Sequence, residues 1–340
     1  MANAQRLQSP SLTTRFRRFV RTPKGHVLGA LILLTGVGSR TPYGAHAIPH
    51  ALIAVAAAVL FDAAVAKVME RKVTFSIGGV ITALIVTDVL SSITPVYLIM
   101  LTTVLALSFK HLLKQGRKPL FNPAAAGLLA TALVFSGAES WWASMPNDPM
   151  WVVLLMLAAG IFVAVRVKKY LPVLVFLGTY FTAILAMALL HWGLPSATPA
   201  DALRAPFVNA ALFVAFFMLT DPPTSPGTVK EQVPFAIISA LVAVAVYDLM
   251  GGLVYLLVGL LVGNGLTAIR ARQRRKADRH PAPARSPVQS FSVTPRLPKR
   301  LGSTAGAGRP AFPPIGAPTR GYRRDRRAAD GADPRQCLTD

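Results

Sequence analysis

Residues 150–191 read MWVVLLMLAAGIFVAVRVKKYLPVLVFLGTYFTAILAMALLH, two long apolar runs on either side of Arg166, Lys168 and Lys169. A helix that crosses the hydrocarbon layer of a membrane needs about 20 mostly apolar residues. It must also satisfy its backbone groups internally, because lipid supplies no hydrogen-bond partners. The stretch therefore predicts two membrane-crossing helices that are joined by a short, positively charged turn.

The composition of the whole chain is that of a membrane protein rather than a soluble domain. Hydrophobic residues make up 53% of the 340 residues and charged residues only 15%, against about a quarter in soluble domains. Most of the formal charge of +22 lies in residues 1–26 and 270–340. We interpret these ends as cytoplasmic segments that can contact anionic lipid. A basic tail can also bind nucleic acid, but no nucleic-acid-binding module accompanies it, so we expect no such partner.

The length criterion, applied along the chain, predicts an all-α integral membrane protein with about ten transmembrane helices. We divide the sequence into a basic cytoplasmic segment (1–25), a polytopic transmembrane domain (26–269) and a disordered basic cytoplasmic tail (270–340). The tail is rich in Pro and Arg and cannot bury enough apolar surface to offset its ordering entropy. The predicted spans are 26–41, 46–66, 74–92, 94–112, 119–137, 149–166, 170–191, 205–220, 233–249 and 250–269.

The charges of the connecting loops independently indicate that the chain crosses the membrane at each of these spans. If the N-terminus is cytoplasmic, the loop after every second span is cytoplasmic too, and the positive-inside rule places Lys and Arg there. Only Arg40 and Arg204 fall in the other loops. Both termini are therefore predicted on the cytoplasmic side of a bacterial plasma membrane. The basic residues of the cytoplasmic loops are Lys67, Arg71, Lys72, Lys110, Lys114, Arg117, Lys118, Arg166, Lys168, Lys169 and Lys230.

Few ionisable groups lie within the predicted spans, and the sequence has no paired-carboxylate motif, Cys–His cluster or glycine-rich phosphate loop. Asp62 falls in the inner half of the second span, whereas Asp88 and Asp248 fall near the outer ends of the third and ninth. Charge within lipid is costly, so each carboxylate could mark an ion or proton path. Each could also be hydrated near an interface or cap a helix, and Asp62 is the better candidate for a path.

Two motifs lie at the cytoplasmic side of the predicted spans. Residues 118–127 read KPLFNPAAAG, in which Asn122 can cap a helix that begins at Pro123. Residues 216–226 read FFMLTDPPTSP and end a span abruptly. On physical grounds alone, the two motifs are a helix start and a helix stop. The second motif leaves four polar side chains at the membrane edge: Thr220, Asp221, Thr224 and Ser225.

The two motifs resemble those of the NqrB/RnfD family, the membrane subunit shared by the sodium-pumping NADH:quinone oxidoreductase and the Rnf electron-transport complex. Members of that family typically show an Asn-Pro-Ala-Ala stretch that opens a central helix. Later they show a Phe-Phe-x-x-Thr-Asp-Pro-x-Thr-Ser-Pro stretch that ends another. Segments 78–85 and 251–264 are similar to the third and final helices of the family. The resemblance covers roughly residues 20–268 and implies ten helices with both termini inside.

The resemblance also implies flavin cofactors. In that family, FMN is attached through a phosphoester to a Thr in a Ser-Gly-Ala-Thr segment of the outer loop after the seventh helix. The matching residues here are Ser196, Ala197 and Thr198, and Thr198 is the candidate attachment site. The match is partial, because Pro195 stands where the family has Ser and Ser196 where it has Gly. A second, noncovalent flavin is implied on the cytoplasmic side, with the candidate residues Asn122, Thr220, Asp221 and Thr224.

We therefore interpret the chain as the membrane subunit of a flavin-dependent electron-transport complex that is not a catalyst by itself. The resemblance implies partner subunits in the membrane and cytoplasm, a quinone, and coupling to ion movement, for which Asp62 is a weak candidate. Two alternatives are a flavin-free transporter or channel and a scaffold that anchors a flavoprotein partner. The sequence shows no convincing inverted repeat, and its charge-poor helices disfavour a path for a polar solute.

Overall fold

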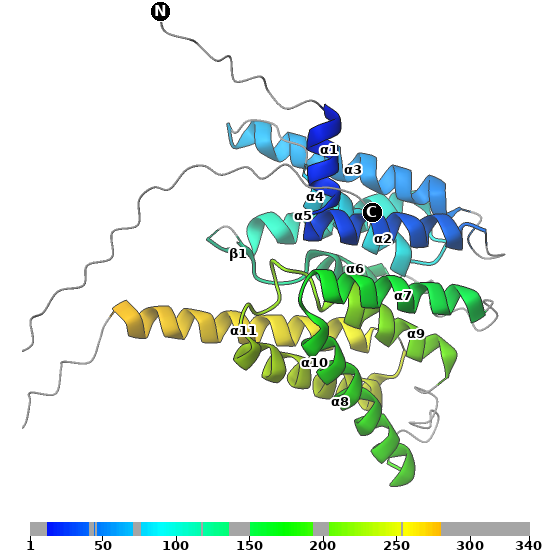
Figure 1. Cartoon of the computed structure of the whole chain (residues 1–340), viewed down its shortest axis with the longest axis vertical. Coiled ribbons are helices and arrows are strands. Elements are labelled where there is room, and N and C mark those ends of the chain that lie inside the picture. The colour runs from blue at the N-terminus through cyan, green and yellow to red at the C-terminus, as the bar shows by residue number, and fades with distance from the viewer. Residues whose placement is uncertain are drawn as a thin grey trace, which may run out of the picture. The chain divides into compact units, whose positions relative to one another are not determined.

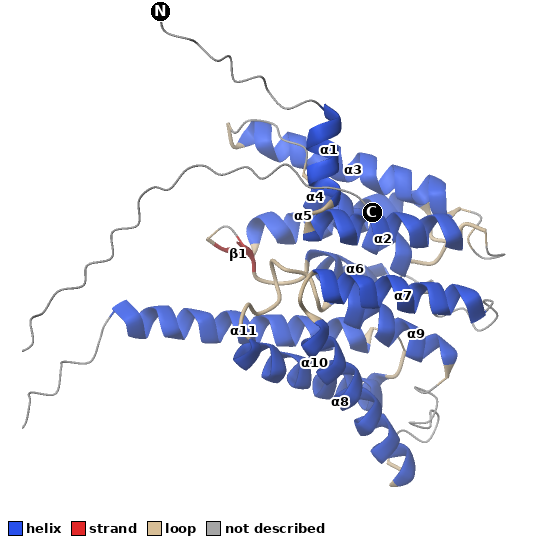
Figure 2. Ribbon diagram, in the orientation of Figure 1, coloured by secondary structure: helices blue, strands red, loops and turns tan. Residues whose placement is uncertain are grey.

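The computed structural model describes residues 12–40, 44, 46–70, 76–116, 118–135, 150–192, 204–252 and 254–279. Helices make up nearly all of the regular structure in these ranges (Figure 2). A short hairpin pairs strand β1 (Lys114–Gln115) with strand β2 (Lys118–Pro119). The helices in chain order are α1 (Leu12–Val20), α2 (Pro23–Gly38), α3 (Ala47–Val68), α4 (Ile77–Val89), α5 (Val96–Leu112), α6 (Pro123–Phe135), α7 (Met150–Arg166), α8 (Tyr170–Leu189), α9 (Ala205–Phe213), η3 (Val214–Met218), α10 (Val229–Met250) and α11 (Tyr255–Arg279).

Sequence and structure agree on where the chain is helical. Each predicted span holds a helix, and the eighth is filled by α9 followed by the π-helix η3. Among the described residues, α3, α8 and α10 are long and apolar enough to cross a membrane by length and composition, and five shorter apolar helices accompany them. The mostly helical fold is thus confirmed. The number of crossings and the side on which the termini lie stay predictions.

The differences from the predicted boundaries lie at the two ends of the helical region. Helix α1 falls within residues 1–25, for which the sequence predicts only a basic segment, and α11 runs ten residues past the predicted boundary at 269 to Arg279. Arg, Lys, Gln and Ala are good helix formers, so they extend α11 after its apolar part ends. The disorder predicted for the rest of the tail falls on residues 280–340, which lie outside the described residues.

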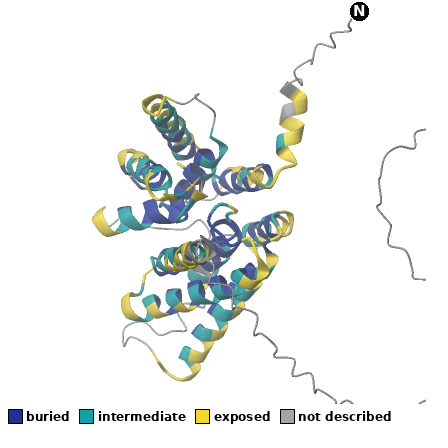
Figure 3. Ribbon diagram, turned by 90° about the vertical axis from the view of Figure 1, so that its left-hand side faces the viewer, coloured by how far each residue is buried: buried dark blue, intermediate teal, exposed yellow. Residues whose placement is uncertain are grey.

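The buried residues lie on the inward faces of the helices (Figure 3). The exposed residues include many large apolar side chains. Leu60, Leu133 and Leu174 are 64–71% exposed although each belongs to a long apolar helix face. Soluble monomers rarely expose apolar area on this scale, because water disfavours it. Such a surface fits a hydrocarbon environment and agrees with the membrane class predicted from the composition.

Two of the most buried helices are too short to cross a bilayer by themselves. Helices α4 and α6 have 13 residues each, which corresponds to about 20 Å, against about 30 Å of hydrocarbon. Residues 82–89 of α4 and 123–128 of α6 are all buried. Non-helical backbone at membrane depth is tolerated where protein covers it or where it lines a cavity. The ends of α4 and α6 therefore depend on partners from neighbouring elements.

Helices α5 and α6 approach closely because one position in their contact carries no side chain. A Cβ atom added to Gly127 would lie 2.6 Å from the Ala106 Cβ and 2.8 Å from the Ala106 backbone nitrogen. Close approach of this kind is what small residues permit in helix pairs within membranes. The contact fixes the position of α6, whose first residues reach the site described below.

Gly127→Ala should lower the free energy of unfolding in detergent by about 1–3 kcal/mol, because the added methyl group meets the backbone of α5. The matched control is Gly178→Ala on α8, where an added Cβ meets no atom within 4 Å. This control should be neutral or stabilising, since Ala is the better helix former. Equal effects of the two substitutions in chemical unfolding would contradict the close contact.

Candidate cofactor site at the basic end

Five elements end together around one cavity. They are the N-terminal ends of α2, α4 and α6 and the C-terminal ends of α5 and η3. The cavity has a volume of about 650 Å³, and its wall includes Lys24, Lys110 and Lys118. We call this end of the helices the basic end. In Figure 1 it is the left side, where β1 and the C-terminal end of α11 lie.

Two buried asparagines join the elements of this wall. Asn122 caps α6, since its Oδ1 accepts a hydrogen bond from the Ala125 N–H (3.1 Å), and its Nδ2 donates to Met218 O (3.1 Å). Asn264 of α11 accepts the backbone N–H of Asn122 at its Oδ1 (2.9 Å) and donates to Thr224 O (3.3 Å). The cap predicted at Asn122 is confirmed, and the two sequence motifs lie in direct contact.

The helix that leads into the second motif widens into a π-turn at its end. The Leu219 N–H donates to Val214 O (2.8 Å), five residues back instead of four. Such turns are often found at functional sites. The Thr220 hydroxyl donates to Phe216 O (2.6 Å), so its hydrogen is already used within the helix. Thr220 therefore presents an acceptor oxygen, rather than a free donor, at the cavity that it lines.

The turn after η3 is held from two other helices. Lys169, which lies between α7 and α8, donates to Pro226 O, and the Gln232 Nε2 of α10 donates to the same carbonyl (3.2 Å). Burial lowers the pKa of the Lys169 ammonium, and the nearby charge of Lys118 lowers it further. Within the turn, the Thr224 hydroxyl donates to Asp221 Oδ2 (3.0 Å). These bonds fix the carboxylate of Asp221 at the cavity wall.

The electrostatics of the cavity favour an anionic or electron-rich group. The N-terminal ends of α4 and α6 both reach the cavity, and a helix N-terminus carries a partial positive charge. Three lysines add to this potential, against the single carboxylate of Asp221. Burial raises the pKa of Asp221 to about 6, and the hydrogen bond from Thr224 and the charges of Lys24 and Lys110 offset part of that rise.

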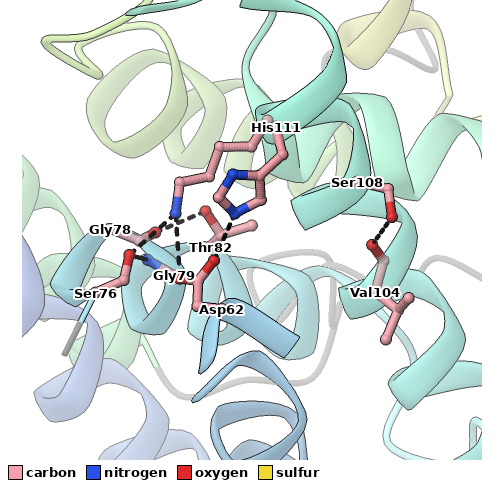
Figure 4. Close-up of polar contacts among 9 residues, drawn as sticks. Asp62, Ser76, Gly78, Gly79, Thr82, Val104, Ser108 and His111 are labelled. Atoms are coloured by element: carbon pink, nitrogen blue, oxygen red, sulfur yellow. Dashed lines mark hydrogen bonds and ion pairs between the residues drawn. The ribbon is translucent and has the colours of Figure 1, made fainter. Parts of the chain in front are cut away.

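Asp62, the candidate for an ion path, is paired with two basic side chains beside this cavity (Figure 4). Its carboxylate lies 3.4 Å from Lys110 Nζ and 2.7 Å from His111 Nε2. Lys110 also donates to Ser76 Oγ (3.1 Å), which in turn accepts the Gly79 N–H (3.2 Å) and caps α4. Asp62 therefore links α3, α4 and α5 at the basic end, and its role in ion movement stays a prediction.

The predicted site residues fall into two groups in the structure. Asn122, Thr220 and Asp221 line the cavity, and Thr224 lies directly behind Asp221. Ser196, Ala197 and Thr198 lie outside the described residues. The described residues stop at Trp192, after α8, and resume at Arg204, before α9, and these two helix ends lie away from the basic end in Figure 1.

Sequence reasoning missed Lys24, Ser76 and Lys110 as parts of the site. Each lies at or beside an end of a predicted span. Lysine at such a position indicates which side of the membrane a loop is on, and serine is common there. Neither residue type by itself therefore indicates a cavity. The sequence held one indication of which residues pair with Asp62. The adjacent pair Lys110 and His111 ends the predicted fourth span, on the same side as the inner half of the second. Only the packing of three helices brings these residues together.

A family model that describes the NQR2, RnfD and RnfE proteins matches residues 9–150 and 148–255. The chain belongs to the NQR2, RnfD, RnfE family. The family supplies the membrane subunit of Nqr and Rnf electron-transport complexes, so the resemblance inferred from the two motifs is confirmed. A comparison with curated proteins gave no match. Asn264 lies beyond the matched residues, although its side chain bonds to Asn122 and Thr224 within them.

Asp221→Asn should change how stability depends on pH. An acid whose pKa is raised in the folded state binds its proton more tightly there, so its contribution to stability is lost as the pH rises from about 4 to 6. The amide of Asp221→Asn does not titrate, so this variant does not lose stability in this way as the pH rises. Its stability relative to the parent should therefore be near zero at pH 4 and favourable by about 2 kcal/mol at pH 7. Parallel dependences of stability on pH for parent and variant across this range would contradict the raised pKa of Asp221.

Proposed function

We propose that the chain acts in a flavin-dependent electron-transport complex and that the cavity at the basic end holds a noncovalent flavin. The observation that carries the proposal is the meeting of the two family motifs in the wall of one cavity, beside three lysines. Family membership supports the role as a membrane subunit. The flavin is our proposal, and it rests on how the residues of the cavity fit such a group.

The cavity suits a flavin in size and in lining. Its volume of about 650 Å³ lies within the range of roughly 300–1,000 Å³ that small-molecule sites occupy. Ile81, Ile85 and Phe217 supply apolar surface for a flat ring system, and Asn122 and Thr220 supply polar groups at its edge. The lysines can pair with a phosphate if the ligand is a nucleotide. A bound flavin would supply the redox chemistry, while these residues orient it and exclude water.

A second flavin, FMN attached to Thr198, is proposed for the far end of the helices. In sequence, the segment with Ser196, Ala197 and Thr198 connects α8 to α9, and the helix ends that flank it lie away from the basic end (Figure 1). Electrons from a cytoplasmic donor subunit would then pass between flavins in this and neighbouring membrane subunits, or reach a quinone. Coupling of this transfer to ion movement is part of the proposal, with Asp62 as the candidate residue.

The cavity flavin can be tested with a residue whose side chain would fill the cavity. A Cβ atom added to Gly78 meets only Lys110 Nζ, at 3.9 Å, so Gly78→Leu should fill the space without straining the backbone. The chain, purified in detergent with its partner subunits, should release free flavin on denaturation. Gly78→Leu should weaken flavin binding by about tenfold or more, which corresponds to at least about 1.4 kcal/mol.

The matched control for this experiment is Gly178→Leu on α8, which should keep the flavin content of the parent, since an added Cβ meets no atom there. The unfolding midpoint of each variant separates loss of flavin from loss of fold. A parent complex that releases no flavin, or a folded Gly78→Leu variant that keeps all of it, would contradict the assignment of the cavity.

Covalent attachment at Thr198 is tested separately, because it survives denaturation. The chain co-expressed with a flavin-attaching enzyme should give a fluorescent band in a denaturing gel. Thr198→Ala should lose this fluorescence, whereas Thr224→Ala at the basic end should keep it. An intact mass equal to that of the bare polypeptide would exclude the covalent flavin and would leave the cavity flavin as a separate question.

A further inference from the structure

Asp88 is a buried carboxyl group that the proposed function does not use. It lies in the last turn of α4 and is 1% exposed. Eleven residues separate it from the start of α4 at Ile77, which places it about 16 Å along the helix from the basic end. Asp88 does not line the cavity, whose wall on α4 ends at Ile85, and it is distinct from the paired Asp62.

The surroundings of Asp88 offer little to stabilise a negative charge. Oδ1 lies 3.0 Å from the Thr35 hydroxyl of α2, and Oδ2 has no hydrogen-bond partner among the described residues. An ionised carboxylate can accept about four hydrogen bonds. A buried carboxylate with one hydrogen bond and no counter-charge is costly by several kcal/mol, so the site favours the neutral acid.

The Thr35 hydroxyl contacts both Leu31 and Asp88, and these two contacts also indicate a neutral carboxylic acid at Asp88. Its oxygen lies 2.9 Å from Leu31 O as well as 3.0 Å from Asp88 Oδ1. A hydroxyl has one hydrogen, and a backbone carbonyl can only accept. If Thr35 donates to Leu31, its bond with Asp88 requires a hydrogen from the carboxyl group. A protonated Asp88 therefore satisfies both distances at once, whereas an ionised Asp88 satisfies only one.

Among the described residues, none of the charged groups around α4 serves as a counter-charge for Asp88. The helices that pack on α4 are α2, α3, α5 and α6, and the described titratable groups of these helices and the turn after α2 form neither a hydrogen bond nor an ion pair with Asp88. Among them, Asp62, Lys110 and His111 pair with one another at the basic end. The full set is Lys24, His26, Arg40, His50, Asp62, Lys67, Tyr97, Lys110 and His111.

We propose that Asp88 is a proton-binding site that exchanges with the end of the bundle opposite the basic end. The exchange breaks the O–H bond of the carboxylic acid and transfers the proton to water, which leaves a carboxylate that takes a proton back on the return step. The route to that end is short, because α4 ends at Val89 and the chain directly after it is accessible at Ser91, which is half-buried, and at Ile93, which is 82% exposed.

A proton fits this place better than a metal cation. Among the described residues, the Thr35 hydroxyl is the one oxygen within hydrogen-bond distance of the Asp88 carboxyl group, and it also donates to Leu31 O within α2. Hard cations bind several oxygen ligands at once, and a single carboxyl group with one hydroxyl provides too few. The proposal does not depend on flavin binding at either end of the helices.

Carbodiimide labelling tests the proposal on the full chain in lipid vesicles. Dicyclohexylcarbodiimide partitions into apolar surroundings and reacts with protonated carboxyl groups, and the adduct is located by peptide mass spectrometry. At pH 7 we expect an adduct on Asp88, none on the ion-paired Asp62, and less labelling of Asp88 as the pH rises. Asp88→Asn should lose the adduct and keep the unfolding midpoint, because Asn has the shape of the neutral acid.

Thr35→Val is the second variant. It removes the shared hydroxyl and leaves the carboxyl group buried, so labelling of Asp88 should persist. Absence of an Asp88 adduct in a folded parent chain would overturn the proposal. So would protection by sodium chloride that choline chloride at the same ionic strength does not give, since the ligand would then be a metal cation. Labelling that does not change with pH would also overturn it, because no exchangeable proton would be titrating.

Discussion

Backbone groups at the end of a helix that stops inside a membrane have to find partners within the protein, because lipid offers none. The start of α6 and the end of η3 are buried within the protein, and the asparagines at positions 122 and 264 supply partners there. One side chain caps α6 and reaches the last carbonyl of η3. The other joins α11 both to the start of α6 and to the turn after η3. These bonds fix the positions of α6, η3 and the turn after η3, which all line the cavity.

The same constraint explains the charge of the cavity. A helix that starts within the bundle directs its free N–H groups, and their partial positive charge, toward whatever lies before it. Here α4 and α6 both start beside the cavity, and lysines that mark the predicted cytoplasmic side by sequence surround it. The lysine of α5 serves twice, since it lines the cavity and also pairs with Asp62. Topology and binding chemistry thus depend on the same residues, which links the membrane orientation to the proposed flavin site.

The two ends of α4 each lie beside a carboxyl group, and the two carboxyl groups differ in the partners that surround them. At the basic end, Asp62 approaches the helix start so closely that a Cβ on Gly79 would lie 2.6 Å from its Oδ2, and two basic groups balance its charge. At the other end, Asp88 has one hydroxyl and no described counter-charge. A hydropathy scale scores the two residues alike, whereas the packing gives Asp62 an ion pair and leaves Asp88 beside a single hydroxyl.

Helix positions could be read from the sequence because apolar runs of this length rarely form anything but a helix in lipid. The cap at Asn122 and the stop before Asp221 were readable for a similar reason, since Asn-Pro and Asp-Pro-Pro have narrow backbone preferences. The π-turn at Leu219, the cavity and the partners of Asp62 were not readable, because each depends on residues far apart in the sequence. The length of α11 was underestimated because a hydropathy criterion finds only the apolar part of a helix, and α11 continues into a polar part that ends at Arg279.

The free energy of unfolding of Asn264→Ala in detergent tests most directly whether this side chain holds the basic end together. The substitution leaves the Asn122 N–H and the Thr224 carbonyl without their buried partners, so a loss of about 2–4 kcal/mol is expected. Thr103→Ala is the comparison, because that buried hydroxyl bonds only within its own helix. A loss for Asn264→Ala no larger than that for Thr103→Ala would contradict the account.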